Sequence, residues 1–236
     1  MTRTPIRPER DVFTMFDSLA GVYDLLNRII SLYCDVHWRR HLARMCIRRG
    51  DERVLDVCCG TGDLVIECAR EMDERGIVCG LDFSPAMLAV MRKKLAVRRL
   101  RPGIISKEGS AQCLPFGDDS FDVVVSAFGV RNISDPGAAL AEMARVLKTG
   151  GVVGILEFVR PDRATRAARF YLRRIIPLVG RMILRTRDNP YQYLADSVEG
   201  FLSAEELKDK LCAAGLKNVK YEGHWTHLIA FHTATK

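Results

Sequence analysis

Two glycines and two acids have the spacing of a site for a nucleoside. The stretch VLDVCCGTGDL, residues 54–64, contains Asp56 in an apolar run and then turns on Gly60 and Gly62. Glycines let the backbone approach a ligand, and the amides that open the next helix face it. Asp82 ends the next apolar run, where a carboxylate can accept both hydroxyls of a ribose. The glycines alone fit a tight corner equally well, but the glycines with Asp82 predict a nucleoside site.

The same turn contains two adjacent cysteines, Cys58 and Cys59, which raise the alternative of redox chemistry or a metal. The chain has 8 cysteines, none in a CxxC pair and none with ligand spacing. We therefore interpret the cysteines mainly as small buried apolar residues. His37 and His41 are four residues apart but have no third ligand, so we predict no metal site. Val65 stands where a dinucleotide fold needs a third glycine, which disfavours NAD.

The elements that must position this turn follow from the apolar pattern. Residues 12–49 have helical spacing and predict an N-terminal helical layer. From residue 53, short apolar runs alternate with helical stretches, which predicts βαβ units and a parallel sheet. We expect helices over 85–97 and 136–148, the second closed by Gly150 and Gly151. A capping box at Ser203 opens a last helix, and two strand-like runs after it predict a terminal hairpin.

Composition limits the class of protein. The chain has 236 residues, 48% of them hydrophobic, which suits one domain with a sizeable core. Its net charge of +7 favours an anionic partner. No apolar run approaches the roughly 20 residues of a membrane-spanning helix, and no signal-peptide core follows the N-terminus, so we expect a cytoplasmic protein. We divide the domain into a helical layer or lid (1–50), a ligand-binding core (51–159), a basic amphipathic insertion (160–200) and a C-terminal helix and hairpin (201–236).

Four segments in this order resemble the class I S-adenosylmethionine methyltransferases: VLDVCCGTGD, GLDFSPAML, AQCLPFGDDSFDVVVSAFGVRN and VLKTGGVVGILEF. The stretches YDLLNRIIS, FGVRNISD and YQYLADSV narrow the resemblance to the ubiquinone/menaquinone biosynthesis C-methyltransferase family (UbiE/MenG type), over residues 13–236. The resemblance implies an α/β, doubly wound Rossmann-like sandwich with a mainly parallel seven-stranded sheet and an antiparallel C-terminal hairpin strand. It implies C-methylation of a polyprenylated hydroquinone, demethylmenaquinol first. The alternatives are the 2-polyprenyl-6-methoxy-1,4-benzoquinol of ubiquinone synthesis, or another small aromatic or lipid acceptor.

The resemblance also assigns the cofactor, S-adenosyl-L-methionine, to residues of the strand ends. The expected cofactor-binding residues are Asp56, Gly60, Thr61, Gly62, Asp82, Phe83, Ser110, Ala111 and Ala127. Ser110 and Ala111 stand where many members have an acid or Asn followed by Ala, and Ala127 stands where a serine often precedes FG. The expected substrate-binding residues are Tyr23 and Asp24 of the lid, and Tyr191 and Tyr193 of the insertion.

Methylation of a ring carbon requires that a phenol, with a pKa near 10, lose its proton or nearly so. A base or a cationic neighbour is therefore needed. Arg131 and Asn132 follow the fourth predicted strand, and we assign them the catalytic role, with the Arg131 guanidinium stabilising a developing phenolate. The alternative is that Arg131 caps its loop or pairs with Asp135. The sequence does not identify the base.

The basic segment, residues 160–187, has arginines interleaved with aromatic and aliphatic residues. Its nine arginines are at positions 160, 163, 166, 169, 173, 174, 181, 185 and 187, against one acid, Asp162. A prenyl tail lies in the bilayer, so we interpret the segment as a peripheral contact with anionic lipid at the inner face of the membrane. RNA is the competing partner, but no RNA-binding module pattern appears, so we predict no nucleic acid. A homodimer is compatible with the sequence.

Overall fold

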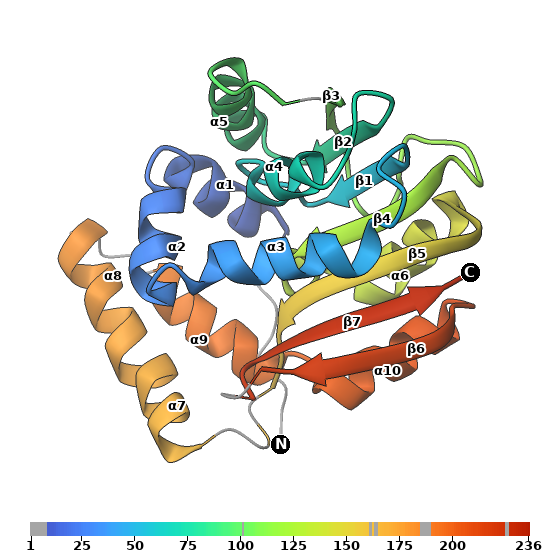
Figure 1. The fold of residues 1–236 in the computed structure, drawn as a ribbon. Coiled ribbons are helices and arrows are strands. Elements are labelled where there is room, and N and C mark those ends of the chain that lie inside the picture. The colour runs from blue at the N-terminus through green and yellow to red at the C-terminus, as the bar shows by residue number, and fades with distance from the viewer. Residues whose placement is uncertain (1–8, 101, 161, 163–164, 185–189, 225–226) are drawn as a thin grey trace.

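Seven strands form one sheet in the order β3-β2-β1-β4-β5-β7-β6 (Figure 1). This computed structural model describes residues 9–236 except 101, 161, 163–164, 185–189 and 225–226. The strands are β1 (Arg53–Val57), β2 (Ile77–Asp82), β3 (Gly103–Glu108), β4 (Phe121–Ala127), β5 (Leu147–Phe158), β6 (Lys217–Gly223) and β7 (Ile229–Thr235). The first five pair in parallel, and β7 runs antiparallel to both β5 and β6. The predicted fold class, including the antiparallel C-terminal hairpin, is confirmed.

Helices cover both faces of the sheet. They are α1 (Glu9–Leu19), α2 (Tyr23–Ser31), α3 (Cys34–Cys46), α4 (Asp63–Arg70), α5 (Pro85–Ala96), α6 (Pro136–Val146), α7 (Arg166–Phe170), α8 (Ile176–Leu184), α9 (Pro190–Gly200) and α10 (Ala204–Ala213), with the short turns η1 (Val130–Asn132) and η2 (Tyr171–Ile175). Figure 1 shows α3 and α4 on one face and α6 and α10 on the other. Successive strand residues alternate between the two cores, so Val54 packs with Leu42 of α3 while Leu55 packs with Leu140 of α6.

Side-chain caps explain where the helices begin. Ser84 accepts from the amide of Met87, Asp135 accepts from the amide of Ala138, and Ser203 forms a capping box with Glu206. The predicted end of the helix over 136–148 was wrong. The helix ends at Val146, and Gly150 and Gly151 lie within β5, because Leu147 already pairs with Phe121 and an irregularity in the β4–β5 ladder accommodates the extra residues.

The N-terminal helices and the segment after β5 lie next to one another at one end of the molecule. The chain reverses between α2 and α3 at Leu32 and Tyr33, both of which have left-handed φ angles (52° and 65°). Helix α2 packs against α8, and the hydroxyl of Tyr171 donates to the carbonyl of Ile30 at 2.6 Å. Among the described residues, no helix combines the length and apolar character needed to cross a bilayer.

Candidate active site

A small pocket lies where β1, β2 and β4 end, the edge at which open α/β sheets bind ligands. The predicted residues that line it are Gly60, Asp82, Phe83, Ser110, Ala111, Ala127, Tyr23 and Asn132. Segments 58–60, 81–83, 109–112 and 127–133 therefore meet here, although they are far apart in the sequence. Helix α1 covers the opening, and the ring of its Phe13 packs edge-on against Phe83 with centroids 5.5 Å apart.

Asp82 is the acid of this pocket. Its carboxylate accepts the amide hydrogens of Gly60 at 2.7 Å and of Ser84 at 2.9 Å. Burial raises the pKa of Asp82, and the amides of Ser84, Gly60 and Phe83 oppose that shift by stabilising the charged form. A buried carboxylate at a strand end is the group that a ribose diol requires.

The glycine turn presents its backbone, not its side chains, to the pocket. Gly60 has a φ of +53° and lines the pocket, and a Cβ added there would meet no protein atom within 4 Å. The turn therefore leaves room for a ligand against the backbone, which fits the nucleoside of the cofactor implied by the resemblance. Gly62 has a φ of +80°, and a Cβ there would collide with Met91, so this glycine is required by packing.

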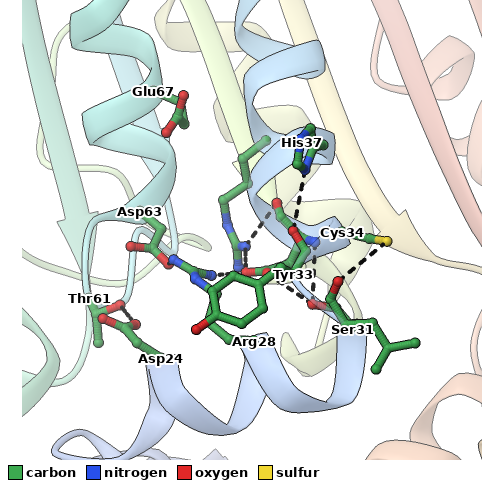
Figure 2. Close-up of polar contacts among 12 residues, drawn as sticks. Asp24, Arg28, Ser31, Tyr33, Cys34, His37, Thr61, Asp63 and Glu67 are labelled. Atoms are coloured by element: carbon green, nitrogen blue, oxygen red, sulfur yellow. Dashed lines mark hydrogen bonds and ion pairs between the residues drawn. The ribbon is translucent and has the colours of Figure 1, made fainter.

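Three predicted residues of this region point elsewhere. Asp56 is 1% exposed below the turn, and neither carboxylate oxygen has a hydrogen-bond partner among the described residues. Burial raises the pKa of Asp56 well above its usual value, and the charge of Arg39 opposes that shift. The Thr61 hydroxyl donates to Asp24 of α2, and both side chains are thereby engaged with each other (Figure 2).

Thr61 and Asp24 belong to a network of charges that ties the N-terminal helices to the cofactor turn (Figure 2). We call this network the latch, and its charged members are Asp24, Arg28, Asp35, Arg39, Asp63 and Lys94. Lys94 of α5 contacts Asp24 at 2.7 Å and Asp63 of α4 at 2.5 Å. Arg28 of α2 contacts Asp63 at 2.6 Å and also pairs with Asp35, which Arg39 contacts at 2.5 Å. Three cations thus meet three carboxylates across α2, α3, α4 and α5.

A second and larger pocket, of about 390 Å³ against about 70 Å³, adjoins the first. Most of its wall is apolar or aromatic. Phe16, Tyr23 and Phe128 line both pockets, so the two spaces meet at these three side chains. The rings of Phe16 and Tyr23 pack edge-on at 5.9 Å, and Phe128 lies tilted against Phe158 at 5.0 Å. The arrangement suits a flat apolar molecule whose edge faces a ligand in the smaller pocket.

Arg131 lies in the wall of the larger pocket and is 6% exposed. It does not pair with Asp135, the predicted alternative. Its Nη1 contacts Glu157 at 2.6 Å, its Nε donates to Ser197 at 3.0 Å, and its guanidinium lies 5.5 Å from the centre of the Phe158 ring. Burial raises the pKa of Glu157, and the nearby Arg131 charge opposes that shift.

The predicted tyrosines also converge on this pocket. Tyr23, Tyr191 and Tyr193 all line it, and the Tyr193 hydroxyl donates to Asn132 at 3.2 Å. Burial raises the pKa of both Tyr23 and Tyr191, so these hydroxyls keep their protons at neutral pH. Sequence reasoning missed three wall residues, Trp38, Phe128 and His224, and also Glu157, which is fully buried behind the wall and pairs with Arg131. Of these, Glu157 carried a signal, because it ends an apolar run as Asp82 does.

The interpretation of the cysteines as buried packing residues is confirmed for Cys46, Cys59, Cys68 and Cys79 and was wrong for the exposed Cys34, Cys113 and Cys212. Burial raises the pKa of both Cys58 and Cys59 well above the usual thiol value, which disfavours the reactive thiolate. No group of three or more His, Cys, Asp or Glu side chains with metal-binding geometry occurs in the described part of the chain. His37 contacts the carbonyl of Tyr33, and His41 contacts Glu222 instead of sharing a site with His37.

The sequence matches a family model over residues 4–236, that of the ubiE/COQ5 methyltransferase family. A demethylmenaquinone methyltransferase of Thermus thermophilus is 40% identical over 224 residues, which cover 94% of this chain and 100% of that protein. A ubiquinone/menaquinone biosynthesis C-methyltransferase UbiE of Geobacter sulfurreducens is 38% identical over 225 residues, which cover 94% of this chain and 87% of that protein.

Solved structures share the fold at lower identity. The cyclase SpnF has a TM-score of 0.71 and 19% identity, with 100% of this chain and 99% of SpnF covered. A S-adenosylmethionine-dependent methyltransferase of Aquifex aeolicus has a TM-score of 0.61 and 18% identity, with 83% of this chain and 88% of that chain covered. At these identities the likeness concerns the architecture alone.

Proposed function

Because the chain belongs to the ubiE/COQ5 methyltransferase family, we propose that it methylates a ring carbon of a polyprenylated quinol, with demethylmenaquinol as acceptor. It is an S-adenosylmethionine-dependent enzyme. The observation that carries the choice of acceptor is the meeting of two pockets at Phe16, Tyr23 and Phe128, one pocket with a buried acid and one large and apolar. Relatives named for demethylmenaquinone support the naphthoquinol over the benzoquinol.

The cofactor-side residues bind and orient. Asp82 would accept the ribose hydroxyls, the backbone at Gly60 would lie against the nucleoside, and Phe83 with Ser110, Ala111 and Ala127 would enclose the adenine end. The bound cofactor supplies an electrophilic methyl group on a sulfonium. Asp56 and Gly62 support the turn from beneath it, and Thr61 connects the turn to Asp24, so these residues and Asp24 act on binding through the position of the turn.

The substrate-side residues hold the ring and its oxygen. Tyr23, Tyr191 and Tyr193 provide flat contact area for an aromatic ring. Among the described residues, no hydrogen bond uses Nη2 of Arg131, so this group can donate to a quinol oxygen, and Asn132, held by Tyr193, lies beside it. Glu157 neutralises much of the Arg131 charge, so Arg131 orients the oxygen and stabilises its developing negative charge without removing the proton.

The test is methyl transfer from labelled S-adenosylmethionine to reduced demethylmenaquinol, with the demethylated benzoquinol and a prenyl-free naphthoquinol as competing acceptors. We expect methylated menaquinol as the main product and a reduction of kcat by roughly 100-fold in Arg131→Met. Cofactor affinity should stay within about twofold of the wild type. Equal activity on an unrelated aromatic acceptor, or loss of cofactor binding as the sole defect in Arg131→Met, would contradict the assignment.

We also propose that α2, α7, η2 and α8 form the surface that contacts the membrane. Phe170, Leu178, Leu25 and Leu32 are exposed by 60%, 54%, 55% and 76%. Arg166, Arg169, Arg174 and Arg181 are exposed on the same helical segment, and Arg163, Arg185 and Arg187 lie outside the described residues. Leu32, Ala167 and Tyr171 also line the larger pocket, so its wall continues into this surface. An anionic bilayer matches the combination of arginines and apolar side chains.

Flotation with vesicles tests this surface. We expect binding to vesicles that contain phosphatidylglycerol, weaker binding to neutral vesicles, and at least a fivefold loss in Arg169→Glu/Arg174→Glu. Arg44→Glu, which removes an exposed arginine on α3, is the matched control. Equal loss in the control, or binding that ignores lipid charge, would contradict the surface. Sedimentation of the same samples without lipid distinguishes a monomer from a homodimer.

A further inference from the structure

We propose that His224 accepts the proton of the quinol hydroxyl next to the ring carbon that is methylated. This inference rests on the proposed function and adds the base that the sequence does not identify. His224 lies directly after β6, in the connection to β7, and its side chain lines the larger pocket. Its backbone is held at both sides, since its amide donates to the carbonyl of Ile229 at 2.9 Å and its carbonyl accepts the amide of His227 at 2.8 Å.

Aromatic contacts connect His224 to the place where the two pockets meet. Its ring lies edge-on to Trp38 with centroids 5.3 Å apart. The ring of Trp38 also lies edge-on to that of Phe128, with centroids 6.3 Å apart, and Phe128 lines both pockets. A quinol ring that packs beside Trp38 and reaches Phe128 therefore points one edge toward the smaller pocket. The same ring lies within the larger pocket, which His224 lines.

The nearby carboxylates, together with Tyr23 and Tyr191, are unsuited to take a proton. Asp35 is 3% exposed and pairs with both Arg28 and Arg39. Glu157 does not line the pocket, because it is fully buried and pairs with Arg131. Burial raises the pKa of Tyr23 and of Tyr191, which weakens both as acids and keeps them protonated. Burial lowers the pKa of His224 from its usual value, so its imidazole is neutral at pH 7 and one ring nitrogen can accept.

The proton inventory is balanced. The phenolic O–H bond breaks, and the proton moves to an imidazole nitrogen of His224 as the ring carbon gains electron density. The ring carbon forms its bond to the methyl group, whose bond to sulfur breaks with the electron pair left on sulfur. The keto form of the ring then loses the proton from the methylated carbon to a water molecule, and the oxygen takes back the proton held by His224. One proton is released in each turnover.

The test compares His224→Ala with His37→Ala, which removes an exposed histidine of α3. We expect His224→Ala to lower kcat with demethylmenaquinol by roughly 100-fold or more, while calorimetry shows unchanged binding of S-adenosylmethionine. Added imidazole should restore kcat at least tenfold in His224→Ala alone, because it fills the vacated site with a proton acceptor. His224→Gln, which fills the site without accepting a proton at pH 7, should stay inactive and gain nothing from imidazole.

A binding measurement separates this inference from the proposed function. With S-adenosylhomocysteine present, the wild type and His37→Ala should bind 1-naphthol about two- to tenfold more tightly than 1-methoxynaphthalene, which has no hydroxyl hydrogen to donate. His224→Ala should lose that preference. Retained kcat in His224→Ala, or lost kcat that imidazole does not restore, overturns the proton transfer. If the wild type itself methylates no quinol, the proposed function fails. The preference for 1-naphthol over 1-methoxynaphthalene then shows by itself whether His224 accepts a hydrogen bond from an aromatic hydroxyl.

Discussion

Three buried carboxylates near the carboxyl ends of three parallel strands have three different environments. Asp82 of β2 accepts backbone amides and lines the small pocket, Glu157 of β5 pairs with Arg131, and Asp56 of β1 has no polar partner among the described residues. Burial raises the pKa of all three, and nearby cations or backbone amides oppose the shift in each case. A buried carboxyl group therefore lines the ligand pocket at Asp82, serves as a counter-ion at Glu157 and lies beneath the glycine turn at Asp56, all in the same sheet.

At the scale of single residues, Asp82→Ala should weaken binding of S-adenosylmethionine. We expect a loss of roughly 10- to 100-fold, since a charged acceptor for hydroxyl hydrogens is removed and the Gly60 amide loses its partner. Titration calorimetry measures the loss. Glu108→Ala is the control, because Glu108 pairs in register with Asp82 on β3 but is exposed to solvent. A similar loss in both variants would mean that the sheet edge, not the carboxylate, is responsible.

Residues near strand ends were predictable, and residues that meet through the N-terminal layer were not. Asp82 and Gly60 follow apolar runs, and parallel strands bring such ends together whatever the rest of the chain does. The bond between Thr61 and Asp24 depends on how α2 docks, which no local pattern encodes. His224 was missed for the same reason, because Trp38 lies 186 positions earlier in the chain and the two meet only after β6 and α3 have packed.

At the scale of elements, the latch holds α2 against α4 and α5. Burial alone would raise the pKa of Asp63, but the charges of Arg39, Lys94 and Arg28 overcome that effect and lower the pKa to about 2. Asp63 is therefore charged at any physiological pH. Asp17 of α1 adds a second attachment, since it accepts the Ser84 hydroxyl at 2.8 Å and the Ala86 amide at 3.3 Å at the start of α5.

Lys94→Met should loosen this attachment. The change leaves Asp24 and Asp63 without their shared cation, so we expect the free energy of unfolding to fall by about 1 to 3 kcal/mol. Urea denaturation measures the change, and proteolysis between α1 and α3 should become faster. Lys93→Met removes an exposed neighbour in the same helix and should leave both unaffected. An unchanged stability of Lys94→Met would show that packing, not charge, holds the layer.

At the scale of the whole molecule, the C-terminal hairpin of β6 and β7 forms one edge of the sheet and contains a buried titratable group. His232 of β7 is fully buried between β5 and β6, and its Nε2 donates to the carbonyl of Ala204 at 2.8 Å. A carbonyl only accepts, so Nε2 carries the hydrogen and Nδ1 is bare and unpartnered among the described residues. Burial lowers the pKa of His232 to about 4.

Stability should therefore fall in mild acid. The pKa of His232 is depressed on folding, so its contribution is fully present above about pH 6.5 and is lost as the pH falls toward 4, by up to about 3 kcal/mol. Denaturation at several pH values measures this slope. His232→Phe should flatten it, whereas His37→Gln should keep it. A slope that survives in His232→Phe would place the acid sensitivity in the carboxylates.

The wall shared by the two pockets has a consequence for kinetics. Phe16 and Tyr23 come from α1 and α2, which cover the smaller pocket, and both side chains also face the larger one. A quinol in the larger pocket presses on the inner side of that cover and keeps it closed. We therefore expect a compulsory order, in which the nucleoside enters first and leaves last. S-adenosylhomocysteine should then compete with S-adenosylmethionine, and saturating quinol should trap labelled cofactor on the enzyme in an isotope-trapping experiment.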